Sequence, residues 1–307
     1  MSDSTPVGAV ESGALDPVSH GADPAPVVTP DVDDREPNLV IQPGATSFRQ
    51  YGRDLIVHSY LIRLLGVREL KLRYRQTLLG PAWVVLQPLI SAGILSFVFG
   101  NVAKLPTAGV PSFLFTYVSM LAWNAFSTSL TRSSSILVGN APLVAKVFFP
   151  RLVLPISTVM GVVLDFGVTL VLVLVLAAVN GFPPTAALLL LPVWLAFVIM
   201  VSLGIGSIIG SLAVRYRDAI AVGGILTQML LYVSPVAYAA SSVPESIRWL
   251  YDLNPLVGLL EAFRWSVLGT PLPSIALLTY SCVAGFLLCI IGFATMERME
   301  PSFADVI

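Results

Sequence analysis

The chain has 307 residues, of which 56% are hydrophobic and only 11% are charged. Soluble domains carry about 25% charged residues, so this composition excludes an ordinary soluble protein and predicts a membrane protein. The formal net charge is -1, and the two histidines, His20 and His58, are too few and too far apart to build a metal site.

The N-terminal segment, residues 1–48, differs from the rest of the chain. It holds seven of the 23 prolines, and eight acidic residues against a single basic residue, Arg35. Such a composition cannot bury enough apolar surface to order the chain, so we expect a disordered, acidic, proline-rich cytoplasmic tail. The segment has no basic stretch followed by an apolar stretch, which argues against a cleaved signal peptide.

Residues 49–80 are predicted to contain a basic amphipathic helix that precedes the first apolar segment. Helical spacing separates a basic face from an apolar face, although Leu64 and Gly66 interrupt the pattern. The basic face holds Arg68, Lys71 and Arg75, and the apolar face holds Val67, Leu70 and Tyr74. A helix of this kind lies in the membrane interface.

Two interpretations of these basic side chains stay open. In one, they anchor the first span by attraction to anionic lipid. In the other, they form an entrance for the pyrophosphate of a substrate, because guanidinium groups hold phosphate oxygens in bidentate contacts. The residues that would form this entrance are Arg68, Lys71, Arg73 and Arg75.

Long uncharged segments follow the basic helix and predict an all-α membrane domain over residues 81–307. A span needs about 20 apolar residues, and the turn at 180–184 divides the longest uncharged segment in two. We therefore expect six transmembrane helices near residues 84–103, 113–131, 153–179, 186–212, 219–240 and 273–295.

The distribution of Lys and Arg predicts that both termini are cytoplasmic. With the N-terminus inside, 14 of the 17 basic residues fall on the inner side. The three on the outer side are Lys104, Arg248 and Arg264.

Two short helices are expected between the fifth and sixth spans, at about 243–269. Ser242 and Glu245 have the spacing of a capping box and would start the first helix. Asn254 would cap the second, and Gly269 would follow its end. The second helix has about 14 residues and measures roughly 21 Å, too short to cross the bilayer, so we expect re-entrant or interfacial outer gate helices.

The aromatic residues of this segment have two interpretations. Their flat faces could stack on the apolar faces of sugars and line a path through the outer gate. They could equally form the aromatic belt of the membrane interface. The residues concerned are Trp249, Tyr251, Phe263 and Trp265.

Few residues inside the predicted spans carry obvious chemistry. Asp165 is the one ionisable residue within them, and intramembrane charges are often functional. Since no second carboxylate or histidine accompanies it, a structural hydrogen bond is favoured over a proton relay. Gly206 and Gly210 form a GxxxG motif that permits close helix approach, inside one subunit or between two. The chain has no GxxxxGK[ST] motif, so it cannot bind ATP through a P-loop.

Four stretches of the sequence resemble the membrane subunit of ABC-2-type polysaccharide exporters, the Wzm and TagG group. They occur in the order of that family between Tyr51 and Arg298, and read KLRYRQTLLGPAWVVLQPLI, PLVAKVFFPRLVLPIS, RYRDAIAVGGILTQMLLYVSPVAY and LNPLVGLLEAFRWSVLG. The resemblance implies a homodimeric channel in the bacterial inner membrane, with each subunit bound to a separate ATPase that holds ATP and Mg²⁺. It implies no cofactor on this chain and no nucleic-acid partner.

The resemblance also assigns roles to three segments. The segment from Leu143 to Arg151 would contact the ATPase as a coupling element, and the turn from Arg215 to Asp218 would lie nearby. The basic helix would be the interfacial gate helix of the family. The coupling residues would be Leu143, Lys146, Phe149, Arg151, Arg215, Arg217 and Asp218.

The expected function is that of a non-enzymatic permease subunit that moves a polyprenyl-diphosphate-linked polysaccharide outward. The Ala, Val and Pro bias of the tail points to a high-GC bacterium, so a cell-wall galactan is one candidate cargo beside an O-antigen-like glycan. The alternative is a drug or lipid exporter of the same superfamily, which needs no long hydrated sugar path. An ion-coupled carrier would show internal repeats and paired intramembrane charges, and a transferase would need an acid/base or metal constellation. The sequence argues against both.

Overall fold

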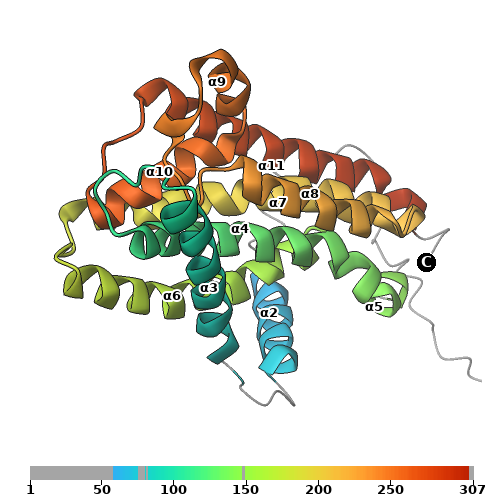
Figure 1. Ribbon diagram of the computed structural model, residues 1–307. Helices are drawn as coiled ribbons and strands as arrows, with labels where there is room; N and C mark the ends of the chain where they lie inside the picture. The colour runs from blue at the N-terminus through green and yellow to red at the C-terminus, as the bar shows by residue number, and fades with distance from the viewer. Residues whose placement is uncertain (1–57, 75–79, 81, 147–148, 304–307) are drawn as a thin grey trace, which may run out of the picture. The chain divides into compact units, whose positions relative to one another are not determined.

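The computed structural model describes residues 58–74, 80, 82–146 and 149–303. Every regular element in these residues is helical, which confirms the all-α class for the described part of the chain (Figure 1). The expected tail, residues 1–48, lies outside the described residues.

Four helices are long and apolar enough to cross a membrane. They are Ala82–Val102, Val153–Val179, Ala186–Arg215 and Ile275–Glu300. These segments contain α3 (Ala82–Leu95) with the π-helix η1 (Ser96–Val102), α6 (Val153–Val179), the 3-10 turn η2 (Ala186–Leu190) with α7 (Leu191–Arg215), and most of α11 (Ile275–Phe303). All four coincide with spans expected from the sequence, because the uncharged apolar runs that define a span are local features.

The helix α4 (Ser112–Gly139) lies inside the bundle and packs against several of the other helices. Its 28 residues measure roughly 42 Å, enough for a span, but it is rich in serine and threonine and is not among the four apolar helices. It contacts α3, α6, α7, α8 and α10, and Figure 1 shows it in the middle of the bundle. A helix enclosed by protein does not need an apolar surface all round, which explains its composition.

The helix α8 (Ala219–Val233) is shorter than expected from the sequence. It has 15 residues and ends at residue 233, whereas the predicted fifth span continues to 240. Pro235 explains the early end, because a proline disfavours the α conformation in the residue before it. Residues 234–239 are not helical, and the chain continues through the 3-10 turn η3 (Ala240–Ser242).

Small residues let α7 approach α4 and α11 closely. A Cβ atom added to Gly206 would lie 1.8 Å from Ser133 Oγ of α4, and one added to Gly210 would lie 2.8 Å from the Ser133 carbonyl oxygen. On another side of α7, a Cβ at Gly204 would lie 2.3 Å from the Leu288 carbonyl oxygen of α11. The GxxxG motif therefore packs α7 inside this chain, as the first of its two interpretations predicted.

The same contacts place the two ends of the bundle. Because residues 206 and 210 of α7 meet residue 133 of α4, these two helices finish at the same end (Figure 1). The short helix α5 (Ala141–Lys146) follows α4 at that end. The helices α9 (Glu245–Asp252) and α10 (Pro255–Leu268) lie at the other end, where α10 packs on α4, α7 and α11.

Candidate functional site

The basic helix α2 (Ser59–Tyr74) is held against α6 through glycine. Gly66 is buried, and a Cβ there would lie 3.0 Å from the Ser157 carbonyl oxygen and 3.1 Å from Met160 Cε. In turn, a Cβ at Gly161 of α6 would lie 3.6 Å from Leu70 Cδ2. The glycine that interrupted the amphipathic pattern is thus a point of close contact between the two helices.

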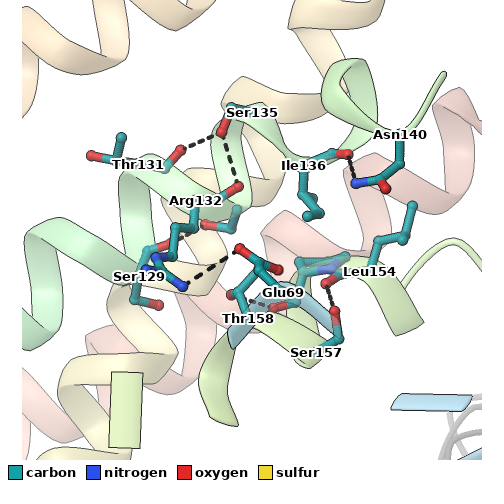
Figure 2. Close-up of polar contacts among 12 residues, drawn as sticks. Glu69, Ser129, Thr131, Arg132, Ser135, Ile136, Asn140, Leu154, Ser157 and Thr158 are labelled. Atoms are coloured by element: carbon teal, nitrogen blue, oxygen red, sulfur yellow. Dashed lines mark hydrogen bonds and ion pairs between the residues drawn. The ribbon is translucent and has the colours of Figure 1, made fainter. Parts of the chain in front are cut away.

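An ion pair fixes the same helix to α4. Glu69 Oε1 lies 3.5 Å from Arg132 Nη1, and the side chains are 28% and 16% exposed (Figure 2). Figure 2 shows Glu69 pointing from α2 towards Arg132. Sequence reasoning missed this pair, although Glu69 is the one acidic residue within α2.

The predicted entrance residues lie on the part of α2 that faces away from this contact. Arg68 and Lys71 are both exposed, whereas Gly66 is buried and Glu69 is half-buried. The side chain of Arg73 and the whole of Arg75 fall outside the described residues. The structure therefore provides an exposed positive surface at Arg68 and Lys71.

The predicted coupling segment is anchored by a small hydrophobic cluster. Val144 and Phe149 are buried in it, together with Leu137 of α4 and Met296 of α11. Leu143 is half-buried against the same cluster, and the Lys146 side chain lies outside the described residues.

Arg151 ties the end of this segment to α11. Its guanidinium carbon lies 5.2 Å from the centre of the Phe149 ring, and its Nε lies 3.6 Å from Glu300 Oε1. The last turns of α11 therefore position the segment, a role that sequence analysis did not assign to Glu300.

The second predicted coupling element is exposed at the same end of the bundle. Arg215 closes α7, and its guanidinium lies 5.5 Å from the centre of the Tyr216 ring. Arg217 and Asp218 follow and are exposed. Since α4 and α7 finish together, this turn and α5 share one end of the bundle (Figure 1).

The two short helices at the other end begin differently from each other. Asn254 caps α10 as expected, accepting a hydrogen bond from the Leu256 amide at 3.0 Å, and Gly269 closes that helix with a φ of 67°. The predicted capping box of α9 is wrong. The helix starts at Glu245 with Pro244 at its N-cap position, and Ser242 belongs to η3 and gives no side-chain cap. Val243 between them is extended, because a proline disfavours the α conformation in the residue before it.

The four predicted aromatic residues do not share one surface. Trp249 is 68% exposed, whereas Phe263 is fully enclosed and meets the Phe166 ring edge-on at 5.9 Å. Tyr251 is buried, and its hydroxyl donates to the Tyr238 hydroxyl at 3.4 Å. Trp265 is half-buried against the main core. In this conformation Trp249 is the member of the group most accessible to a ligand.

Arg264 of α10 is a buried cation that sequence reasoning treated only as an outer charge. Its Nη1 donates to Ser119 Oγ at 3.0 Å and to the Pro235 carbonyl oxygen, and its guanidinium lies 4.4 Å from the centre of the Phe115 ring. Glu261 Oε1 lies 3.7 Å from its Nη2. An arginine stays protonated at neutral pH in proteins, and the Glu261 carboxylate and the Phe115 ring both favour its charged form.

Asp165 lies in a small cavity of mixed polar and apolar lining between α3, α4 and α6. The cavity measures about 50 Å³ and is lined by Gln87, Asn124, Thr128 and Thr169 among others. Thr169 Oγ1 donates to the Asp165 carbonyl oxygen at 3.0 Å and reaches the Val84 carbonyl oxygen of α3 at 3.4 Å. A cavity of this size is large enough for a water molecule, and a structural role for Asp165 stays a prediction.

The described residues contain no group of His, Cys, Asp and Glu that could hold a metal ion.

Comparison with known proteins decides the family. Residues 60–268 match the membrane family described as ABC-2 type transporter. The chain belongs to this family. That match runs from α2 to the end of α10, so it includes the basic helix, the coupling segment and the outer helices.

Curated members of the family with similar sequences include polysaccharide export proteins. The chain is 30% identical over 257 residues to the O-antigen export system permease protein RfbA of Klebsiella pneumoniae, covering 81% of this chain and 96% of that protein. It is 30% identical over 257 residues to the RfbA protein of Myxococcus xanthus, covering 83% and 98%. It is 27% identical over 257 residues to the polysialic acid transport protein KpsM of Escherichia coli, covering 80% and 96%.

Proposed function

We propose that this chain is the channel-forming permease subunit of an ATP-driven exporter that moves a lipid-linked polysaccharide outward across the bacterial inner membrane. One observation carries the proposal: the chain aligns with 96% to 98% of the length of permeases named for O-antigen export. Relatives named for polysialic acid transport and capsule polysaccharide export align over a similar share. An O-antigen-like glycan or a cell-wall galactan is the proposed cargo.

The proposed topology has six spans and both termini in the cytoplasm. Beside the four long apolar helices, the two remaining spans would be α4, which is long enough, and α8 together with the residues that follow it. The excess of Lys and Arg near α2, α5 and the 215–218 turn supports a cytoplasmic position for that end of the bundle. The helices α9 and α10 would then be outer gate helices, re-entrant because neither is long enough to span.

The proposed assembly is a homodimer with two copies of a separate P-loop ATPase. ATP and Mg²⁺ would be held by the ATPase, since this chain has no P-loop motif. The coupling segment and the 215–218 turn would meet the ATPase, and their position at one end of the bundle supports this assignment. Arg151 and Phe149 would transmit movement of the ATPase to α6 and to the end of α11.

The proposed entrance for the substrate pyrophosphate is the basic face of α2. Arg68 and Lys71 are exposed there, and Arg73 and Arg75 follow in the sequence. These basic side chains are close together in the sequence, and their positive charges suit a diphosphate. The helix would lie in the membrane interface, where the polyprenyl chain of the substrate can remain in the membrane.

The test combines purification with depletion. The tagged chain is purified from its native membrane in mild detergent, its companions are identified by mass spectrometry, and surface polysaccharide is measured in cells depleted of the chain. We expect a P-loop ATPase at one to one and a loss of surface polysaccharide, with lipid-linked glycan accumulating inside. A chain that purifies alone from cells whose surface polysaccharide does not depend on it would refute the proposal.

A further inference from the structure

A polar cavity of about 350 Å³ lies beside α9 and α10 and does not belong to the entrance or the coupling segment. It is bounded by these two helices, by the start of α11, and by the segments around Ala108 and Ala239. Its volume lies within the range of about 300 to 1,000 Å³ that is usual for small-molecule sites. It is large enough for one sugar ring.

The floor of this cavity is buried and its rim is exposed. Arg264 and Phe115 form the floor and are 2% and 1% exposed. Ser241, Leu272 and Ser274 form the rim and are exposed. Arg264 is already fixed by Ser119 and the Pro235 carbonyl, so the floor is preorganised before any ligand arrives.

The charges around the cavity balance and are loosely paired. Arg248 Nε lies 3.9 Å from Asp252 Oδ2, and Arg264 Nη2 lies 3.7 Å from Glu261 Oε1. Both distances are too long for hydrogen bonds, so these groups keep donors and acceptors for a third partner. Asp252 Oδ1 is buried and has no hydrogen-bond partner among the described residues. Two cations facing two anions give no net charge, which favours a neutral ligand over an ion.

Apolar groups complete the lining. Phe115, Leu272, Leu277 and two prolines lie among the polar residues. A pyranose ring presents hydroxyl groups at its edge and C–H groups on its faces. Carboxylates accept hydrogen bonds from hydroxyl groups and guanidiniums donate to them, while apolar walls cover the C–H faces.

We propose that this cavity binds a neutral pyranose unit, with Asp252, Glu261 and Arg248 contacting its hydroxyl groups and Phe115 and Leu272 covering its faces. The proposal rests on the proposed function for the source of the sugar, which would be the exported glycan as it passes the outer helices.

The test measures sugar binding to the purified full chain, together with any ATPase that copurifies, in lipid nanodiscs. The probes are the methyl glycosides of galactose, glucose, mannose and N-acetylglucosamine, and neutral oligosaccharides cut from the surface glycan of the source cells. Binding is followed by saturation-transfer NMR, with inorganic phosphate as a separate competitor. Ser241→Trp fills the cavity from its rim and Asp252→Asn removes one acceptor without changing shape. Their matched controls on α9, outside the cavity lining, are Ser246→Trp and Glu245→Gln.

We expect at least one glycoside or oligosaccharide to bind, with affinity reduced about tenfold or more in Ser241→Trp and Asp252→Asn and unchanged in both controls. Phosphate should not displace it. Displacement by phosphate, equal binding by Ser241→Trp, or no binding of any probe would overturn the proposal.

The depletion experiment separates this inference from the proposed function. If surface polysaccharide is lost on depletion but no sugar binds, the cavity proposal fails alone. If sugars bind through this cavity but surface polysaccharide does not depend on the chain, the export function fails and the carbohydrate site stands.

Discussion

Glu69 and Arg132, which lie 63 positions apart in the sequence, pair at 3.5 Å and join the basic helix α2 to the central helix α4. Both side chains are largely shielded, and the contact sits beside the place where Gly66 lets α2 rest on α6. An interfacial helix that was held only by lipid would not need such an attachment. The pair therefore sets the position of the basic face that we propose as the substrate entrance.

Breaking this pair should loosen α2 without unfolding the bundle. We expect Glu69→Gln to raise hydrogen exchange in α2 and to lower the free energy of unfolding by about 1 kcal/mol, because the pair is partly shielded. Combining it with Arg132→Gln should show a non-additive effect in a double-mutant cycle. The exposed Glu245→Gln serves as the control, and equal exchange in both variants would contradict the role of the pair.

Reversing the exposed charges of α2 should block export. Arg68→Glu with Lys71→Glu would remove two of the proposed phosphate contacts and add repulsion. We therefore expect export to fall more than about tenfold, since a hydrogen bond to a charged group contributes about 1.5 kcal/mol or more. Arg73→Glu with Arg75→Glu should have the same effect. The measurement is surface polysaccharide in cells that carry each variant.

A charge-retaining swap controls for folding in that experiment. Arg68→Lys with Lys71→Arg keeps both positive charges and should export normally or nearly so. Unchanged export in the reversed variants, with the ATPase still bound, would show that the basic face only anchors the helix.

Enlarging Gly206 should separate α7 from α4. In Gly206→Ala the new Cβ would lie 1.8 Å from Ser133 Oγ and 3.0 Å from the Leu130 carbonyl oxygen, so either the serine or the backbone must move. We expect destabilisation by about 1 to 3 kcal/mol, the usual cost of overpacking. Gly167→Ala in α6 is the matched control, because nothing lies within 4 Å of its added Cβ. Thermal unfolding in detergent compares the two, and an equal midpoint would count against the close packing.

Removing the Arg264 cation should be among the most damaging single changes in the outer helices. Arg264→Met leaves Glu261, Ser119 and the Pro235 carbonyl without their partner, and such losses cost about 3 to 5 kcal/mol. Arg264→Lys restores the charge but not the fork of donors, so it should recover only part of the stability. Thermal unfolding measures both variants, and a small effect of Arg264→Met would mean that water replaces the guanidinium.

The pair between Arg151 and Glu300 offers a test of coupling. Glu300→Gln should leave the chain folded and bound to its ATPase while lowering export several-fold, because the coupling segment is then held less firmly against α11. Arg151→Gln together with Glu300→Gln should be no worse than the more damaging single change. Loss of the ATPase from purified Glu300→Gln would instead make the end of α11 part of the binding surface.

Local features of the sequence determine where most of the helices begin and end. Asn254 and Gly269 delimit α10 because a cap and a left-handed residue act on neighbouring backbone. The apolar runs of α6 and α11 are equally local, so their spans could be predicted. The early end of α8 at Val233 could also have been predicted, since Pro235 stands in the sequence.

The sequence by itself determined an all-helical membrane protein, with apolar spans, caps and a basic helix, because hydropathy and capping depend on residues close together in the chain. The tertiary structure alone decided which of its charged and small residues matter to one another. Arg264 meets Ser119 across 145 positions, and Gly66 and Glu69 find partners on α6 and α4. No local pattern encodes such pairs, because the free energy of burying a charge or fitting a glycine depends on what the folded chain brings beside it.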